Sequence, residues 1–274
     1  MPLATIELTS RIGVGVRTDK AALLSGAHAA ELRGLLERYG VVIARDIGFD
    51  DDEEMAFAAT LGTLRQEFGH PIMKVTLDKR ENPEFADYFV ATNQWHMDGT
   101  HEDVPPLASI LTPRVLAPWG GETEFANMYA AYEDLPDDQK AQLESIRIVH
   151  TKLASIAHTL DNPSEEDLDR LRNYGSKIHP AVWHHRSGRR SIVMSASADH
   201  VVGMDPAESA ALIQWIKDWC EQRRYVYQHQ WRMGDLLIWD NTGTTHRVCD
   251  YDHACGRRLH RVTLLGEERL AQAA

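Results

Sequence analysis

The stretch Gln-Trp-His-Met-Asp-Gly-Thr at residues 94–100 is the part of the sequence around which we expect the chain to be organised. In an extended segment, residues two apart point to the same side, so His96 and Asp98 would present an imidazole and a carboxylate to one point. We expect their partner to be His246, which ends the stretch Trp-Asp-Asn-Thr-Gly-Thr-Thr-His at residues 239–246. Imidazole nitrogens and carboxylate oxygens are ligands of divalent transition metals, so these three residues predict a metal site.

Two kinds of metal site use this ligand set. Two histidines and one carboxylate form the facial triad of non-haem Fe(II) oxygenases, which leaves the other positions of an octahedron open for a chelating co-substrate and O2. A catalytic zinc site can use the same ligand types. The His-x-Asp pair alone does not decide, because a chain with 14 histidines will contain such a pair by chance. His101 would face away from His96 on a continuing strand, so we expect it to line a pocket or the surface instead of binding metal.

Several longer blocks give the metal motif its context. The four strongest are Trp-His-Met-Asp at 95–98, Trp-Gly-Gly-Glu-Thr-Glu-Phe-Ala-Asn-Met at 119–128, Gly-Asp-Leu-Leu-Ile-Trp-Asp-Asn at 234–241 and Arg-Arg-Leu-His-Arg-Val-Thr at 257–263. A weaker fifth is His-Pro-Ala-Val at 179–182, followed by Ser-Gly-Arg-Arg at 187–190. In this order and at these separations the blocks resemble the TauD/TfdA family of Fe(II)- and 2-oxoglutarate-dependent dioxygenases, from about residue 40 to residue 266. Residues 124–128 are more similar to the aryloxyacetate-degrading branch than to the taurine branch.

The resemblance implies a metal and two co-substrates. His96, Asp98 and His246 match the Fe(II) ligands of the family, and 2-oxoglutarate and O2 are the co-substrates that the family uses. Thr123 and Arg257 match the residues that hold the distal carboxylate of 2-oxoglutarate, which a guanidinium grips through two parallel hydrogen bonds. Because Asp98 keeps a carboxylate on the metal, no coordination position is left for a halide, and hydroxylation is favoured over halogenation.

The resemblance also implies where the prime substrate binds. Arg261 matches the arginine that binds the anionic end of the substrate. On a strand it would share a face with Arg257, about 13 Å away, while Arg258 would face outward. Two inward arginines are costly in a dry core unless each meets an anion, and an internal ion pair is the structural alternative for Arg261. His70 falls where the taurine branch has a histidine that contacts substrate.

The function expected from these matches is hydroxylation of a small anionic organic substrate with release of succinate and CO2. The substrate would be a carboxylate or a sulfonate, with aryloxyalkanoates among the candidates. One alternative is a biosynthetic tailoring dioxygenase acting on an amino-acid derivative or a natural product. A second alternative, from a different class, is a metal-binding protein without oxygenase activity.

Composition limits the partners and the location of the protein. The formal net charge of −12 argues against nucleic acid as a partner, because phosphates bind basic surfaces. No apolar run is long enough to span a bilayer and no leader is recognisable, so we expect a cytoplasmic protein without membrane contact. The three cysteines form no C-x-x-C pair and are expected to be free thiols. The family resemblance implies a homo-oligomer, a dimer or a tetramer.

The pattern of strands and helices indicates a mainly β fold with flanking helices, built on a double-stranded β-helix, or jelly-roll, core. We expect one domain spanning residues 1–274, with a long insertion at 150–178 for which a mobile lid and a solvated surface helix are the two hypotheses. The predicted segments are helices at 21–39, 50–61 and 205–222, a strand at 84–92, a hairpin around 187–188, and an irregular surface connection at 63–83. The residues expected on the buried face of the last helix are Leu212, Trp215, Ile216 and Trp219.

Overall fold

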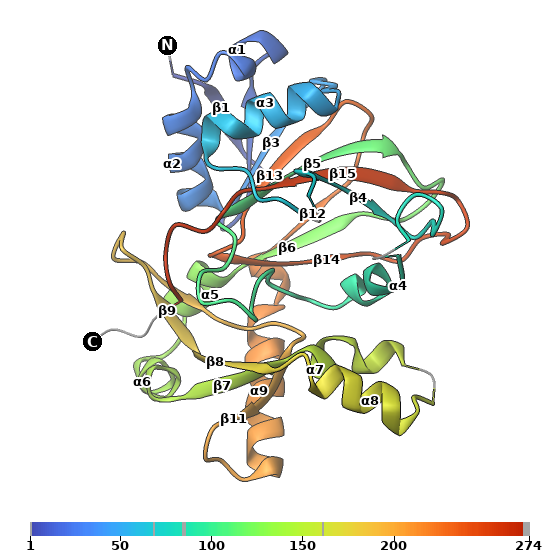
Figure 1. The fold of residues 1–274 in the computed structure, drawn as a ribbon. Coiled ribbons are helices and arrows are strands. Elements are labelled where there is room, and N and C mark those ends of the chain that lie inside the picture. Colours follow the sequence, from blue (N-terminus) through green and yellow to red (C-terminus); the bar gives the residue numbers. More distant parts are fainter. Residues whose placement is uncertain (1, 68, 84–85, 161, 271–274) are drawn as a thin grey trace.

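The computed structural model describes residues 2–67, 69–83, 86–160 and 162–270, and its core is a jelly roll made of two facing sheets (Figure 1). The larger sheet has the strand order β1-β2-β3-β13-β5-β15-β4. In that order the strands are Ala4–Glu7, Val14–Arg17, Val41–Ala44, Leu236–Asp240, Ala108–Val115, Arg258–Thr263 and Ile72–Thr76. The smaller sheet has the order β12-β6-β14, formed by Val226–His229, Thr123–Asn127 and Thr244–Val248. The predicted fold class is confirmed.

Strand β13 shows how the sequence builds this core. Successive residues of a strand point to opposite faces. Leu237 and Trp239 therefore point into the space between the two sheets, where Trp239 meets Phe125 of β6 with ring centroids 5.7 Å apart. Leu236 and Ile238 point outward and pack under the helices. A strand that is buried on both faces appears in the sequence as a continuous apolar run.

Helices α1 (Lys20–Leu24), α2 (Ala29–Tyr39) and α3 (Asp51–Leu61) cover the outer face of the larger sheet (Figure 1). The prediction of one helix over 21–39 was wrong, because Gly26 has φ 71° and separates α1 from α2. The helix predicted at 50–61 is confirmed, with Asp50 and Glu53 forming a capping box at its start. Among the described residues, no helix has both the length and the apolar character needed to cross a membrane.

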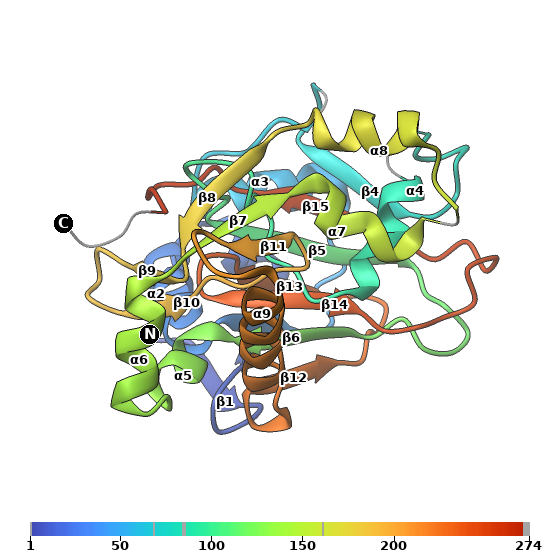
Figure 2. The same ribbon diagram turned by 90° about the horizontal axis from the view of Figure 1, so that it is seen from below.

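A second layer packs against the smaller sheet and lies beneath it in Figure 1, and Figure 2 views the molecule from that side. It contains β7 (Arg147–Thr151), β8 (Ser176–Pro180), β11 (Ala198–Val201) and the long helix α9 (Pro206–Cys220). Between β7 and β8 lie α7 (Lys152–Ile156), η2 (Ala157–Thr159) and α8 (Glu165–Arg172). The hairpin expected around 187–188 is present as β9 (Val182–His184) and β10 (Arg190–Ile192), and α5 (Met128–Glu133) and α6 (Asp137–Ser145) precede β7.

Helix α9 starts where its capping Asp205 and Pro206 predict, but its buried face differs from the expected one. Its fully buried residues are Ser209, Ile213, Ile216 and Cys220. Of the four residues expected to be buried, only Ile216 is in this set, and the other three are partly buried at the edge of the same core. The buried residues are spaced three and four apart, so the helix face that meets the core runs through these four, and Leu212, Trp215 and Trp219 each lie one position to its side.

Two predictions for the segment before His96 were wrong. The strand predicted at 84–92 is absent from its described residues: Ala86–Phe89 is helix α4 and Val90–Asn93 is the short helix η1, while residues 84 and 85 lie outside the described ranges. Ala86 and Phe89 are both buried, which is helical and not strand spacing. The connection at 63–83 contains β4, which pairs with β15 and places Met73 opposite Arg261. Local sequence did not reveal β4, because its partner lies far along the chain.

The first turn of α3 docks on the larger sheet through a buried charged cluster. Glu54 is fully buried and accepts hydrogen bonds from Thr112 and Arg114 of β5. Asp51 accepts from Arg114 and contacts His260 of β15 at 2.7 Å. Burial is the largest influence on Glu54 and raises the pKa of its carboxyl group to about 8. The cluster therefore ties α3 to the strand that carries Arg261.

We predict that Glu54→Gln will remove a pH dependence of stability. The folded-state pKa of Glu54 lies above its unfolded value, so the folded protein binds the extra proton between about pH 4.5 and 8, and stability falls as pH rises through that window. The melting temperature of the variant, relative to the native protein, should therefore rise steadily from pH 5 to pH 8.5. Thermal unfolding across this range measures it, with the exposed Glu208→Gln as the control. A constant difference between variant and native protein would contradict the prediction.

Candidate metal centre and active site

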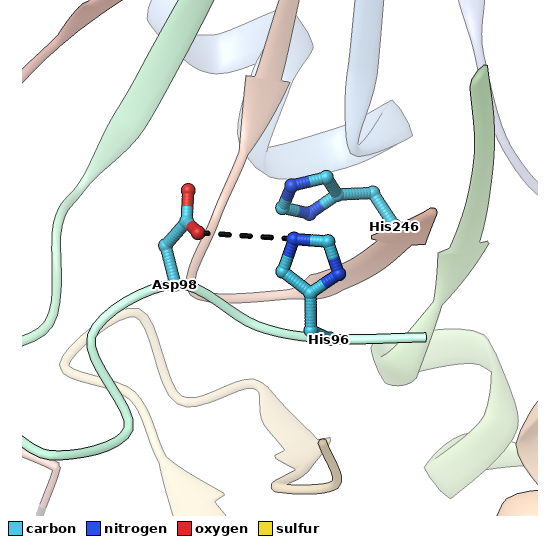
Figure 3. A group of neighbouring side chains, drawn as sticks. All are labelled: His96, Asp98 and His246. Atoms are coloured by element: carbon cyan, nitrogen blue, oxygen red, sulfur yellow. Dashed lines mark ion pairs between the residues drawn. The ribbon is translucent and has the colours of Figure 1, made fainter. Parts of the chain in front are cut away.

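The structure brings His96, Asp98 and His246 together from two distant parts of the chain (Figure 3). One candidate ligand atom from each lies within 4.8 Å of the others, and His96 Nε2 is 4.0 Å from an oxygen of Asp98. His246 lies in the middle of β14. His96 pairs with it in an isolated bridge, with the two backbone hydrogen bonds at 3.0 and 2.8 Å. The imidazole rings are 4.1 Å apart and Asp98 faces them from the turn that follows.

The hydrogen bonds leave the ring nitrogens free to bind a cation. His96 Nδ1 lies 2.8 Å from the carbonyl oxygen of Gln94, which places the proton on Nδ1 and leaves the Nε2 lone pair free. The buried Nδ1 of His246 has no hydrogen-bond partner. Two imidazoles this close, each with an open nitrogen, are an arrangement that a bound cation stabilises.

The charge states also suit a divalent cation. Burial lowers the pKa of His96, and burial together with His96 lowers the pKa of His246 well below its usual range. Burial alone would raise the pKa of Asp98, but Arg261 and the two histidines outweigh it and the pKa falls to about 2. At neutral pH the site therefore offers two neutral imidazoles and one carboxylate. This donor set fits Fe(II).

Asn241 holds the backbone of Asp98 in place. Its side-chain oxygen accepts a hydrogen bond from the Asp98 N–H at 3.0 Å, and its side-chain nitrogen donates to the Asp98 carbonyl oxygen, also at 3.0 Å. The same nitrogen donates to the carbonyl of Pro106 at 3.0 Å, and Asn241 is completely buried. The turn also requires Gly99, which has φ 77° and whose added Cβ would lie 2.4 Å from Pro106. In the sequence, Asn241 was noted only as the last residue of the motif at 234–241, and no role was predicted for it.

Arg261 reaches the candidate metal ligands from β15. Its Nη1 donates to Asp98 Oδ2 at 3.1 Å, and its Nη2 contacts the sulfur of Met73 on β4 at 3.4 Å. Its buried Nε has no partner. The structural alternative considered from sequence, an internal ion pair, is therefore present in this structure. The pair does not enclose the guanidinium, because 14 % of the Arg261 side chain remains exposed.

Arg257 is a buried cation without a carboxylate. It is 5 % exposed, its Nη2 donates to the carbonyl of Gly121 at 2.9 Å, and its guanidinium lies 5.0 Å from the ring centre of Tyr251. It forms no ion pair with any acidic group in the described part of the chain. A cavity of about 230 Å³ borders it, lined also by Gly121 and Trp231. Gly121 has φ 74°, and a Cβ there would lie 2.8 Å from Arg257 Nε, so only glycine allows the arginine this position.

The remaining residues singled out from sequence have the following positions. Thr123 is buried at the start of β6, and its hydroxyl accepts a hydrogen bond from Trp231. Arg258 faces away from the site, as predicted, and pairs with Glu81 at 3.1 Å. His101 is exposed, and its nearest acidic partner is Glu102.

His70 is not brought to the site by any contact. It is exposed, and its Nδ1 accepts a hydrogen bond from the backbone N–H of Ile72 at 3.1 Å. Within the described ranges, no hydrogen bond, ion pair or ring contact joins it to the metal triad or to Arg261. Its match to a substrate-contacting histidine therefore stays a prediction from sequence.

Sequence reasoning missed a charged clamp on the outer side of the site. Arg247, which follows His246, donates to Glu124 at 2.8 Å and lies 4.8 Å from the ring centre of Trp95, the residue before His96. Glu124 is 4 % exposed. The signal was present in the sequence, since each of these residues directly adjoins a predicted site residue and so faces the opposite side of its strand.

Comparisons with known proteins agree with this geometry. The family model described as "Taurine catabolism dioxygenase TauD, TfdA family" matches residues 4–263. An alpha-ketoglutarate-dependent 2,4-dichlorophenoxyacetate dioxygenase of Burkholderia sp. (strain RASC) is 32% identical over 91% of this chain and 91% of its own length. An (S)-phenoxypropionate/alpha-ketoglutarate-dioxygenase of Sphingobium herbicidovorans is 27% identical over 95% of this chain and 94% of its own. The crystal structure of AAD-2 with Mn(II) and N-oxalylglycine superposes with a TM-score of 0.83 at 27% identity, covering 98% of this chain and all of AAD-2.

We predict that Asn241→Ala will weaken metal binding by a factor of about 10 to 100, because the N–H and C=O of Asp98 lose their buried partner and the carboxylate is no longer oriented. Equilibrium titration with Mn(II) measures the affinity without requiring turnover. The matched control is Asn127→Ala. Asn127 is equally buried and caps α5 through Ala130, but it touches no proposed ligand. Both variants should melt at lower temperature than the native protein. Native Mn(II) affinity in folded Asn241→Ala would contradict the prediction.

Proposed function

The chain belongs to the TauD/TfdA family of 2-oxoglutarate-dependent dioxygenases, and from this premise we propose that it hydroxylates a small organic anion held by Arg261. The observation that carries the proposal is the position of Arg261, 3.1 Å from the carboxylate of Asp98 and with 14 % of its side chain exposed. A carboxylate or sulfonate can pair with the exposed part of this guanidinium, since charged acceptors form the strongest hydrogen bonds with guanidinium groups.

The same position limits which carbon can react. An anion bound to Arg261 lies next to a proposed metal ligand, so the reactive C–H bond must be only a few bonds from the anionic group. Holding the bond there supplies the orientation that such a reaction needs. The sheets and helices around the site leave the side chains of His96 and Asp98 only 15 % and 18 % exposed, which limits the access of bulk water. A compact anion with its reactive carbon beside the acidic group fits this requirement.

We propose that His96, Asp98 and His246 hold Fe(II), and that Arg257 and Thr123 hold the distal carboxylate of 2-oxoglutarate. The support for the second pair is that Arg257 is buried without an acidic partner, a state that is costly unless an anion joins it. Bound together, Fe(II), 2-oxoglutarate and O2 supply the oxidising power for hydroxylation, with succinate and CO2 as co-products. The task of the chain's own residues is to bind, to orient and to exclude water.

Among small anions, aryloxyalkanoates are the substrate class we propose. Two relatives act, by their names, on 2,4-dichlorophenoxyacetate and on (S)-phenoxypropionate. In such molecules the carbon between the ether oxygen and the carboxylate is one bond from the anionic group, as the position of Arg261 requires. Hydroxylation there gives a hemiacetal-type product that collapses with cleavage of the C–O bond.

We also propose that the enzyme works in the cytoplasm as a dimer or tetramer. Cys220, Cys249 and Cys255 are all unpaired, which suits a reducing compartment. The oligomeric state is proposed from the family resemblance. Light scattering on the purified full chain would measure it directly.

The first test is succinate formation. The Fe(II)-loaded protein, supplied with 2-oxoglutarate, ascorbate and O2, should form succinate slowly alone and much faster with an aryloxyacetate or aryloxypropionate. Alkylsulfonates, alkyl sulfates and N-acyl amino acids complete the panel. Stimulation by a different class would overturn the substrate proposal and keep the dioxygenase. No succinate from metal-loaded protein would contradict the proposed activity.

A second prediction separates the two arginines. Arg261→Ala should raise the KM for the anionic substrate by a factor of about 10 to 100, the loss expected for a charge-assisted hydrogen bond, and leave 2-oxoglutarate binding nearly unchanged. Arg257→Ala should weaken 2-oxoglutarate binding and leave the KM for the anionic substrate nearly unchanged. Arg258→Ala, on the outer side of the same strand, is the control and should change neither value. Equal losses of both ligands in Arg261→Ala would refute its assignment to substrate.

A further inference from the structure

Trp231 lies between two groups that the proposed function assigns to 2-oxoglutarate. It follows β12, packs partly buried against the core between the sheets, and meets the ring of His229 edge-on at 4.4 Å. Its indole Nε1 donates a hydrogen bond to Thr123 Oγ1 at 3.0 Å. It also lines the cavity of about 230 Å³ that borders Arg257. One side chain therefore contacts the threonine and lines the cavity beside the arginine.

The chemistry of this hydrogen bond decides the role of Thr123. An indole N–H can only donate, so the oxygen of Thr123 must be the acceptor. A threonine hydroxyl carries a single proton, and this contact does not use it. No other described residue is hydrogen-bonded to this hydroxyl. The proton of Thr123 is therefore free to be donated to a further partner.

We propose that Trp231 is a positioning residue that orients Thr123 as a donor toward the distal carboxylate of a 2-oxo diacid bound to Arg257. The inference rests on the proposed function of Arg257 and Thr123. With the indole occupying one side of the oxygen, the hydroxyl proton is directed away from Trp231 and toward an acceptor. Trp231 acts through Thr123 and contributes to the preference for a second carboxylate on the oxo acid.

This role predicts a preference that packing alone would not produce. A 2-oxo monoacid has no distal carboxylate. It therefore cannot accept a hydrogen bond from the Thr123 hydroxyl or bind the guanidinium of Arg257. Loss of the indole N–H should therefore weaken binding of the diacid and not of the monoacid. A structural role of Trp231 would affect both acids alike, because both need the same folded pocket.

The test is equilibrium binding of 2-oxoglutarate and of 2-oxobutyrate to the Mn(II)-loaded full chain, by calorimetry. Trp231→Phe keeps an aromatic ring and removes the N–H donor. We expect it to weaken 2-oxoglutarate binding about fivefold to tenfold, the effect of one buried hydrogen bond, with 2-oxobutyrate unchanged. In a Thr123→Val background, the further change to Trp231→Phe should have no effect on 2-oxoglutarate, because the group that Trp231 orients is gone.

A matched control is available on α9. Trp219 also donates its indole N–H, to the carbonyl of Ala131 at 2.8 Å, and has no contact with the proposed cofactor residues. Trp219→Phe should lower thermal stability and leave both oxo-acid affinities at native values. This variant shows what loss of an indole hydrogen bond does elsewhere in the molecule.

Three results would overturn the inference: unchanged 2-oxoglutarate affinity in Trp231→Phe, equal weakening of both oxo acids, or an undiminished effect in the Thr123→Val background. These three results can be told apart from a failure of the proposed function, because that failure would appear in the oxo-acid affinities of the native protein, which are measured before any variant is made. A native chain that binds 2-oxobutyrate as tightly as 2-oxoglutarate would overturn the assignment of Arg257 and Thr123, and this inference with it.

Discussion

The pair of backbone hydrogen bonds between His96 and His246 is the interaction on which the site depends. It joins an irregular segment to the middle of β14, so that two imidazoles separated by 150 positions in the sequence face each other at 4.1 Å. The side chain of Asn241 then adds a comparable pair of hydrogen bonds to Asp98, two residues further along. The three proposed ligands are thus positioned through their backbones, which leaves their side chains free to meet a cation.

The jelly roll contains two arginines, Arg257 and Arg261, whose positive charges are not fully balanced by acidic side chains. Bound anions would balance them. Arg257 is buried beside the carbonyl of Gly121 and the side chain of Tyr251, and Arg261 shares one carboxylate, that of Asp98, with the candidate metal site. Buried cations of this kind cost stability unless an anion pairs with them. Arg257 has no acidic partner among the described residues, and Arg261 has one that it would share with a cation, which suits the proposed reaction between a diacid co-substrate and an anionic substrate. This charge pattern links the fold to the proposed chemistry.

The two faces of the strands serve different purposes. On their inner faces, β6, β14 and β15 carry Thr123, His246 and Arg261. On the opposite side, Glu124 and Arg247 clamp the smaller sheet over Trp95, and His260 joins the cluster that binds α3 to the larger sheet. Because neighbours in a strand point in opposite directions, each functional side chain is supported by an adjacent residue that anchors the strand from outside. Support of this kind keeps a binding site rigid.

The sequence alone determined the features that depend on local chemistry or on motif. The helix at 50–61, the capped start of α9 and the hairpin at 187–188 were predicted from short stretches, since caps and turns act over a few residues. The jelly-roll class followed from the pattern of strands and helices along the chain, and the three residues of the candidate metal cluster from the order of several motifs. Only the tertiary structure decided that residues 86–93 are helical, that β4 exists, that Asn241 is hydrogen-bonded to the backbone of Asp98 and that Trp231 is hydrogen-bonded to Thr123. These features depend on partners more than 100 positions away in the chain, or on how a face packs, and no local pattern records which distant groups will meet.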